Sequence, residues 1–153
     1  MKTAICGITV IAASLLTLSS FANEKHDLKC TLDSGEEMTV RHSINTVYIG
    51  LQKPGGDSKE EDVIKFDIPS GEARQLLSDS GHGQVIYGLR GDNSHREYAA
   101  FIQYTKRGNE VSTYFSEVDK EGNEASKSYC KPNTITVNEA LTQKGISGVK
   151  VID

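Results

Sequence analysis

The sequence predicts a small, mainly β protein, either an antiparallel β-barrel or a β-sandwich with a short C-terminal helix. Three observations support this fold class. Short stretches of alternating apolar and polar residues recur about every ten residues, with turn-forming residues between them. The longest series, residues 83–130, is typical of four strands joined by three turns. Finally, Cys30 and Cys130 lie near the two ends of the pattern, where a disulfide would join the first of these strands to the last.

The N-terminus has the pattern of a secretory signal peptide over residues 1–22. Lys2 gives it a basic start, and residues 8–18 form an uncharged apolar run that leads to small residues at its end. This run is shorter than the roughly 20 residues needed to span a membrane. We therefore expect cleavage after Ala22, export to the periplasm or the cell exterior, no stable membrane insertion, and one domain over residues 23–153.

Two cysteines remain after cleavage, because Cys6 leaves with the signal peptide. In an exported chain, such a pair predicts a disulfide, here Cys30–Cys130. It would close a loop of about 100 residues and stabilise the fold by roughly 4–5 kcal/mol. The alternatives are two free thiols or a metal site, but no His-x-His or Cys-x-x-Cys lies nearby to favour a metal. We expect no cofactor.

Alternation of apolar and polar residues predicts the strands in order along the chain. The expected strands are 28–32, 37–42, 46–51, 63–68, 84–90, 95–105, 110–118, 124–130 and 149–152. Residues 95–105 are apolar on both faces, which predicts that this longest strand is central and covered on both sides. Residues 71–78 instead have apolar residues at helical spacing and are expected to form about two helical turns.

Clusters of Gly, Pro, Asn, Asp and Ser predict the connections between the strands. The expected turns and loops are 33–36, 43–45, 52–62, 79–83, 91–94, 106–109 and 119–123. Beyond Pro132, Thr136 and Glu139 have the spacing of a capping box, with Thr136 as the N-cap of a short helix over 140–144. Gly145 is placed to end that helix.

Charge and motifs exclude several functional classes. The formal net charge is −4 with both signs scattered along the chain, whereas nucleic acids and anionic membranes require a basic patch. The sequence contains no nucleotide-binding, nucleophile-elbow, zinc-protease or calcium-loop motif. Its four histidines lack the spacing of metal ligands, and without tryptophan the commonest sugar-stacking platform is missing. These observations disfavour an enzyme.

The loop over residues 79–83 is the most informative candidate site. Asp79, Ser80 and His82 have the residue types of a hydrolase triad, but a triad normally draws its members from separate elements. We interpret the loop instead as a binding loop, because a small, polar, glycine-rich segment can approach a partner closely. The candidate binding residues, in this loop and in the turn over 91–96, are Ser80, Gly81, His82, Asp92, Asn93 and Arg96.

Ser80 and Gly81 resemble the start of the Ser-Gly-x-x-Tyr loop of periplasmic lysozyme inhibitors. Members of that family are small exported β-barrels, often disulfide-bonded, that insert this loop into the active site of the enzyme. The resemblance covers the general layout and this dipeptide. The chain departs from the motif because its next tyrosine, Tyr87, follows Gly81 by six residues and not by three.

The sequence therefore favours a small exported protein-binding module, of the inhibitor or immunity type, whose partner is another protein of the envelope or the cell exterior. One alternative is a small hydrolase or a ligand-binding β-barrel, which would require a pocket that gathers His82 or His95 with an acid. Another alternative is a structural protein of the envelope with no specific ligand.

Overall fold

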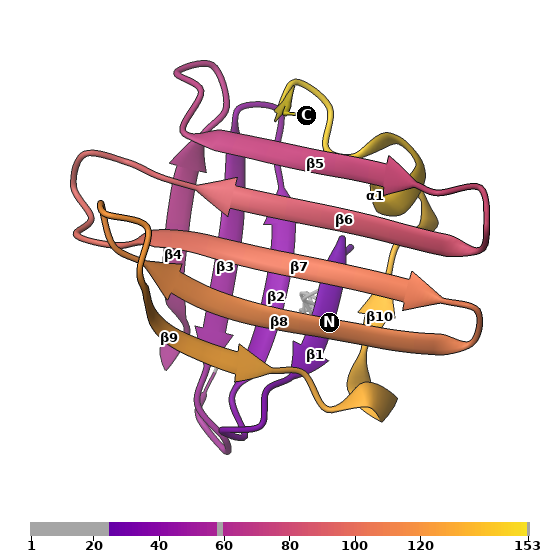
Figure 1. Ribbon diagram of the computed structural model, residues 1–153. Coiled ribbons are helices and arrows are strands. Elements are labelled where there is room, and N and C mark those ends of the chain that lie inside the picture. The colour runs from indigo at the N-terminus through magenta and orange to yellow at the C-terminus, as the bar shows by residue number, and fades with distance from the viewer. Residues whose placement is uncertain (1–24, 58–59, 153) are drawn as a thin grey trace, which may run out of the picture.

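The structure, a computed structural model, describes residues 25–57 and 60–152 and is mainly β (Figure 1). One sheet has the strand order β10-β1-β2-β3-β4, and the other has the order β11-β5-β6-β7-β8-β9. The strands are β1 (Leu28–Thr31), β2 (Glu37–His42), β3 (Thr46–Gln52), β4 (Asp62–Asp67), β5 (Ala73–Asp79), β6 (Gln84–Gly91), β7 (Ala99–Arg107), β8 (Glu110–Val118), β9 (Glu124–Tyr129), β10 (Thr136–Val137) and β11 (Lys150–Val151). The chain also forms the 3-10 turn η2 (Pro132–Thr134) and the short helix α1 (Glu139–Lys144).

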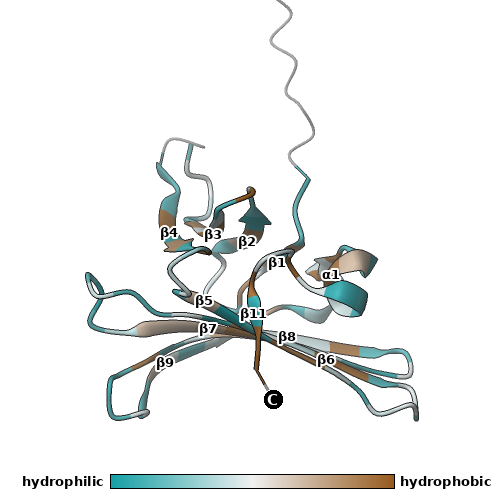
Figure 2. Cartoon of the chain, turned by 90° about the horizontal axis from the view of Figure 1, so that it is seen from above, coloured by the Kyte–Doolittle hydropathy of each residue, from teal (hydrophilic) through white to brown (hydrophobic). Residues whose placement is uncertain are grey.

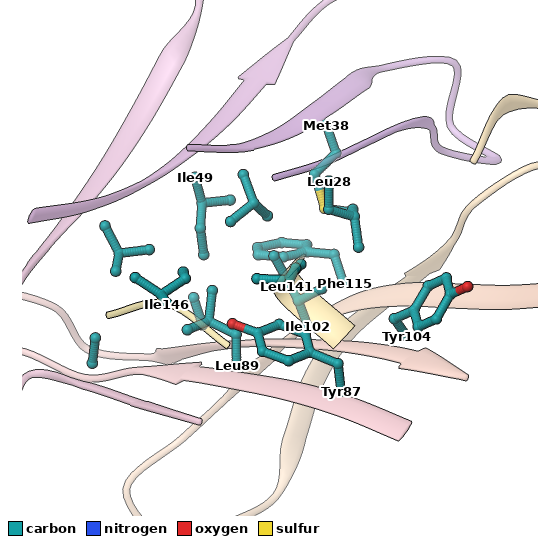
Figure 3. Packing of buried hydrophobic residues seen from close by; sticks show 14 of the residues in the cluster. Leu28, Met38, Ile49, Tyr87, Leu89, Ile102, Tyr104, Phe115, Leu141 and Ile146 are labelled. Carbon is teal, nitrogen blue, oxygen red and sulfur yellow. The ribbon is translucent and has the colours of Figure 1, made fainter. Parts of the chain in front are cut away.

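The two sheets lie face to face, and their strands cross at a steep angle (Figures 1 and 2). Side chains from both inner faces and from α1 fill the space between the sheets (Figure 3). The largest buried side chains include Leu28, Met38, Ile49, Phe66, Tyr87, Leu89, Ile102, Leu141 and Ile146. Within the described part of the chain the sheets do not close into a barrel, and no element covers the outer face of the six-stranded sheet (Figure 2).

A close contact between the sheets explains why β6 ends in glycine. The ring of Phe66, on β4, lies where a β-carbon of Gly91 would be. Phe66 is fully buried, so its ring has little room to move away. A side chain at position 91 would therefore push the two sheets apart at this point.

The predicted disulfide between Cys30 and Cys130 is confirmed, with 5.7 Å between the two α-carbons. Cys30 is on β1, and Cys130 follows β9, so the bond joins one sheet to the other. Backbone hydrogen bonds flank it: Lys131 N–H donates to the carbonyl of Thr31 (2.8 Å), and Asp33 N–H donates to the carbonyl of Tyr129 (2.7 Å). Both sulfurs lie in the core.

The predicted helix over residues 71–78 is wrong, because this segment forms strand β5. It pairs with β6 along its whole length, in the register Ala73↔Gly91 to Asp79↔Val85. Ala73 and Gln75 are buried while Arg74 is exposed, which is the alternation of a strand. The buried polar Gln75 hides this alternation in the sequence.

The predicted central strand exists but is shorter than expected. β7 begins at Ala99, has nine residues, as β8 does, and lies inside the six-stranded sheet. Residues before it form a turn instead, in which Asn93 accepts a hydrogen bond from the His95 N–H (3.1 Å). Coverage on both faces is also wrong: Ile102 is buried on the inner face, but Phe101 on the outer face is only half-buried.

The C-terminal helix is present, but its N-cap is Asn138 and not Thr136. The Asn138 side chain accepts a hydrogen bond from Ala140 N–H (3.1 Å), and Gly145 ends the helix as predicted. Thr136 instead belongs to β10, which pairs with β1. Because the backbone of Thr136 pairs with β1, it cannot begin a helix, and the N-cap lies two residues later than predicted.

The predicted last strand is confirmed as β11, which pairs with β5 in parallel. The buried side chain of Gln75 holds the preceding segment: it donates to the carbonyls of Ile146 (2.9 Å) and Val149 (3.0 Å) and accepts from Ile146 N–H (2.8 Å). The predicted signal peptide lies outside the described residues. No helix in the described ranges is long and apolar enough to cross a membrane.

Candidate functional site: a basic cleft around His42 and Asp27

The candidate site is built around a contact between a buried aspartate and a histidine. Asp27 directly precedes β1, and its backbone is fixed on two sides, by an N–H that donates to Val40 and a carbonyl that accepts from Asn138 (both 2.8 Å). Its side chain is 7% exposed, and Oδ2 lies 2.5 Å from Nδ1 of His42 at the end of β2. The His42 side chain is 37% exposed. A carboxylate can only accept, so Nδ1–H of His42 donates, which leaves Nε2 for a ligand.

Two hollows lie at His42, and the first of them also has Asp27 in its lining. The first, of about 600 Å³, lies between α1 and the strands that carry the pair, and it is lined by Lys25, Asp27, His42, Asn138, Ala140, Leu141, Lys144, Gly145 and Ser147. The second, of about 470 Å³, is lined by Lys25, Arg41, His42, Tyr48, Val63 and Lys65. Lys25 and His42 line both hollows, so the two adjoin at these residues, and we call them together the His42 cleft.

The second hollow lies over the outer face of the five-stranded sheet. Strand pairing places Arg41, Tyr48 and Lys65 side by side on β2, β3 and β4. Glu61 forms an ion pair with Arg41 (2.9 Å) and accepts a hydrogen bond from the Thr39 hydroxyl (3.2 Å). Side-chain hydrogen bonds from Ser43 and Thr46 lower the pKa of Tyr48, and the nearby charges of Lys65 and Arg41 lower it further.

The His42 cleft carries an excess of positive charge although the chain as a whole has a formal charge of −4. Its basic lining residues are Lys25, Arg41, Lys65 and Lys144, and its acidic lining residue is Asp27. Among the described residues, no carboxylate forms an ion pair with any of the three lysines. This local field favours an anionic ligand.

An exposed apolar side chain stands beside the cleft. Ile44 lies at the tip of the β2–β3 hairpin, two residues after His42, and is 90% exposed. The hairpin tip is held in place, because Ser43 N–H donates to Thr46 and the carbonyl of Asn45 accepts from Ile68 N–H (both 2.8 Å). The fold thus presents a large aliphatic side chain on a fixed turn.

The structure does not bring the predicted binding residues together. Ser80, Gly81 and His82 form the exposed β5–β6 turn, whereas Asp92, Asn93 and Arg96 lie at the other end of β6 (Figure 1). The second group also has contacts within the fold. Asn93 donates to the carbonyl of Lys65 (3.2 Å), and Arg96 forms an ion pair with Glu117 (2.8 Å).

Sequence reasoning missed the pair of His42 and Asp27, which are 15 residues apart. The available signal was the hairpin of β1 and β2. Its register pairs Leu28 with Val40, so the residues just outside that pair must come close in space. The pattern of the strands alone does not reveal this register.

The pair has part of the geometry of a catalytic site. A histidine held by a buried carboxylate through Nδ1 is arranged as a general base. Ser147 lines the same cleft, but no hydroxyl in the described ranges forms a hydrogen bond with His42. No three His, Cys, Asp or Glu side chains of those ranges gather in a group that could hold a metal ion.

Comparison with known proteins gives no relative that bears on this site. No protein-family model matches the chain, and neither a curated protein nor a solved structure is significantly similar to it.

Proposed function

We propose that this chain is a small exported protein-binding module, periplasmic or secreted after cleavage behind Ala22, of the inhibitor or immunity type. Its two face-to-face sheets would serve as a β-sandwich scaffold for the contact surfaces. The signal-like N-terminus and the disulfide between the sheets support export, since disulfides persist in oxidising compartments.

The observation that carries this proposal is the exposure of Ile44 beside the His42 cleft. A large aliphatic side chain at a fixed hairpin tip costs solubility and contributes nothing to the core. Such residues, surrounded by polar groups, are typical of the central contacts of protein interfaces. We therefore place the main contact at the hairpin tip and the cleft.

The loop over residues 91–96 is proposed as an extension of the same contact face. Asn93 bonds to the backbone of Lys65, and Lys65 lines the cleft. The turn over 79–83 is proposed as a separate contact, because it lies at the opposite end of β6.

A photo-crosslinking amino acid at position 44, introduced into the chain in its source organism, tests this function. We expect one crosslinked protein, which mass spectrometry identifies. In a second step without the crosslinking amino acid, less of that protein should co-purify with the Ile44→Asp variant than with the original chain. Val151→Asp is the matched control, since Val151 is also an exposed aliphatic residue (51%) but lies on β11. Equal recovery with Ile44→Asp and Val151→Asp would overturn the proposal.

A second candidate, a small hydrolase, is favoured by the Asp27–His42 contact. In it, His42 would take a proton from Ser147 or from water, and Asp27 would stabilise the resulting imidazolium. The test is hydrolysis of p-nitrophenyl acetate by the purified chain. Turnover that is lost in His42→Gln and Asp27→Asn but kept in His82→Gln would favour it, while equal rates in all variants would exclude this role of the pair.

A further inference from the structure

We propose that the His42 cleft binds an acidic peptide segment of the partner protein, an inference that rests on the proposed function and names the chemistry of the contact. The ligand groups would be carboxylates of Asp or Glu side chains, or a C-terminal carboxylate.

Unpaired charge is the first argument. Lys25, Lys65 and Lys144 are exposed, line the cleft, and have no ion-pair partner among the described residues. Exposed lysines elsewhere, such as Lys120 and Lys150, also form no ion pair within the described ranges, so the distinguishing feature of the cleft lysines is that they gather along one hollowed surface. A segment that lies along the cleft from Lys144 past Lys25 to Lys65 would supply the missing carboxylates.

Hydrogen-bond donors are the second argument. Asp27 holds Nδ1 of His42 and so fixes the ring at the cleft, and Nε2 donates to a carboxylate when the ring carries both protons. Asn138 uses its Oδ1 to cap α1, which leaves its amide NH₂ as a donor at the wall of the cleft. Donors fixed in this way suit carboxylate oxygens, because their own conformation is already determined by the fold.

The shape and surroundings of the cleft favour a peptide over a nucleic acid or a lipid surface. Val63 and Ala140 give the lining accessible apolar parts, and the exposed Ile44 follows His42 by two residues, so apolar side chains next to the acidic ones would also find contacts. A long polyanion would extend past the cleft and meet the remaining surface of a chain whose formal net charge, cleft included, is −4.

The test uses fluorescence anisotropy with a fluorescein-labelled hexaglutamate peptide at low salt, and hexaglutamine as the uncharged control. We expect binding of hexaglutamate only, weakened by added salt because the contacts are exposed charges. The variant K25E/K65E/K144E is expected to weaken binding at least about tenfold, as is appropriate for three exposed ion pairs replaced by repulsion. The neutral variant K25Q/K65Q/K144Q should weaken it to an intermediate degree.

A matched control separates the cleft from net charge. K120E/K131E/K150E makes the same change in total charge at exposed lysines that lie outside both hollows, and it should leave the affinity within about twofold. Equal weakening by the two triple variants would overturn the proposal. So would binding of single-stranded DNA or of phosphatidylglycerol vesicles at the cleft without binding of hexaglutamate.

The result can be distinguished from a failure of the proposed function. If crosslinking at position 44 captures a partner but substitution of the cleft lysines does not change the affinity for hexaglutamate, the acidic-peptide inference is wrong and the proposed function stands. If the cleft binds hexaglutamate but no partner depends on Ile44, the inference about chemistry stands without the proposed interface.

Discussion

At the scale of single residues, Tyr87 and Gln75 show two opposite ways to place a polar group in this core. Tyr87 is 1% exposed, and its hydroxyl has no hydrogen-bond partner among the described residues (Figure 3). Gln75, 2% exposed, has three bonds to the backbone. A buried polar group stabilises a fold only when it is hydrogen-bonded, so removal of these two groups should have opposite effects.

Replacing Tyr87 with Phe should raise the free energy of unfolding by about 1 kcal/mol at neutral pH, because it removes a desolvated hydroxyl without opening a cavity. Burial and the charge of Asp27 raise the pKa of Tyr87. The folded chain therefore keeps the phenol proton to a higher pH than the unfolded chain does, and stability should decline once the pH exceeds about 10. Urea unfolding from pH 7 to 11 should show a smaller decline in Tyr87→Phe. An identical pH dependence would contradict the assignment.

Gln75→Leu should lower the free energy of unfolding by about 3–5 kcal/mol, because Ile146 N–H and the Val149 carbonyl lose a buried partner and the Ile146 carbonyl keeps only its bond from Val149 N–H. Hydrogen exchange at Ile146 N–H should also become faster. Gln143→Leu, at an exposed position of α1, is the control and should change stability by less than about 0.5 kcal/mol. A loss below about 1 kcal/mol in Gln75→Leu would contradict the role assigned to this side chain.

At the scale of elements, β6 carries two glycines on opposite faces of the sheet. Gly91 faces Phe66 in the core, whereas Gly88 lies on the outer face, where a β-carbon would make only ordinary contacts with Leu76 and Phe101 (3.4 and 3.9 Å). The same chemical change at these two positions therefore tests whether the sheets pack as described.

Gly91→Ala should destabilise the chain by about 2–3 kcal/mol, since the added methyl group overlaps the Phe66 ring. Gly88→Ala should be neutral or slightly stabilising, because alanine restricts the unfolded chain without a clash. Thermal unfolding of both variants gives the comparison. Equal midpoints would show that Phe66 does not press on Gly91.

Strand positions could be predicted where apolar and polar residues alternate cleanly, as in β2, β3 and β8. The prediction failed at β5, where the buried Gln75 interrupts the apolar face and Leu76 and Leu77 imitate helical spacing. The His42 cleft could not be predicted, because it depends on which strands pair and in what register. The contacts proposed for residues 79–83 and 91–96 stay predictions.

At the scale of the whole molecule, the disulfide is a covalent cross-link between the sheets, added to the backbone connections. Its position was predictable because the predicted loss of Cys6 with the signal peptide leaves one possible pairing. The division of the strands into two sheets was not, because it depends on pairing between distant parts of the chain, such as β1 with β10 and β5 with β11.

The variant C30A/C130A should lose about 4 kcal/mol of stability in the chain-entropy account, since the bond spans 100 residues. The measurement is guanidinium unfolding of the double variant against the oxidised chain. Reduced wild-type chain should match the double variant to within about 1 kcal/mol, the small remainder being the loss of two buried sulfurs. An unchanged unfolding midpoint would show that the bond adds no stability.

The pairing of β1 with β10 sets the order in which the molecule can be completed. A chain that emerges from a ribosome or a translocation channel with its N-terminus first exposes β1 and its neighbour β2 early, but β10, the neighbour on the other side of β1, arrives only with residues 136–137. Cys30 likewise cannot form its disulfide until Cys130 has emerged. The first sheet therefore stays open at one edge until almost the whole chain has emerged, and such late, long-range closure slows folding. Late closure keeps the chain unfolded for longer, which the proposed export would require if the chain crosses a membrane before it folds.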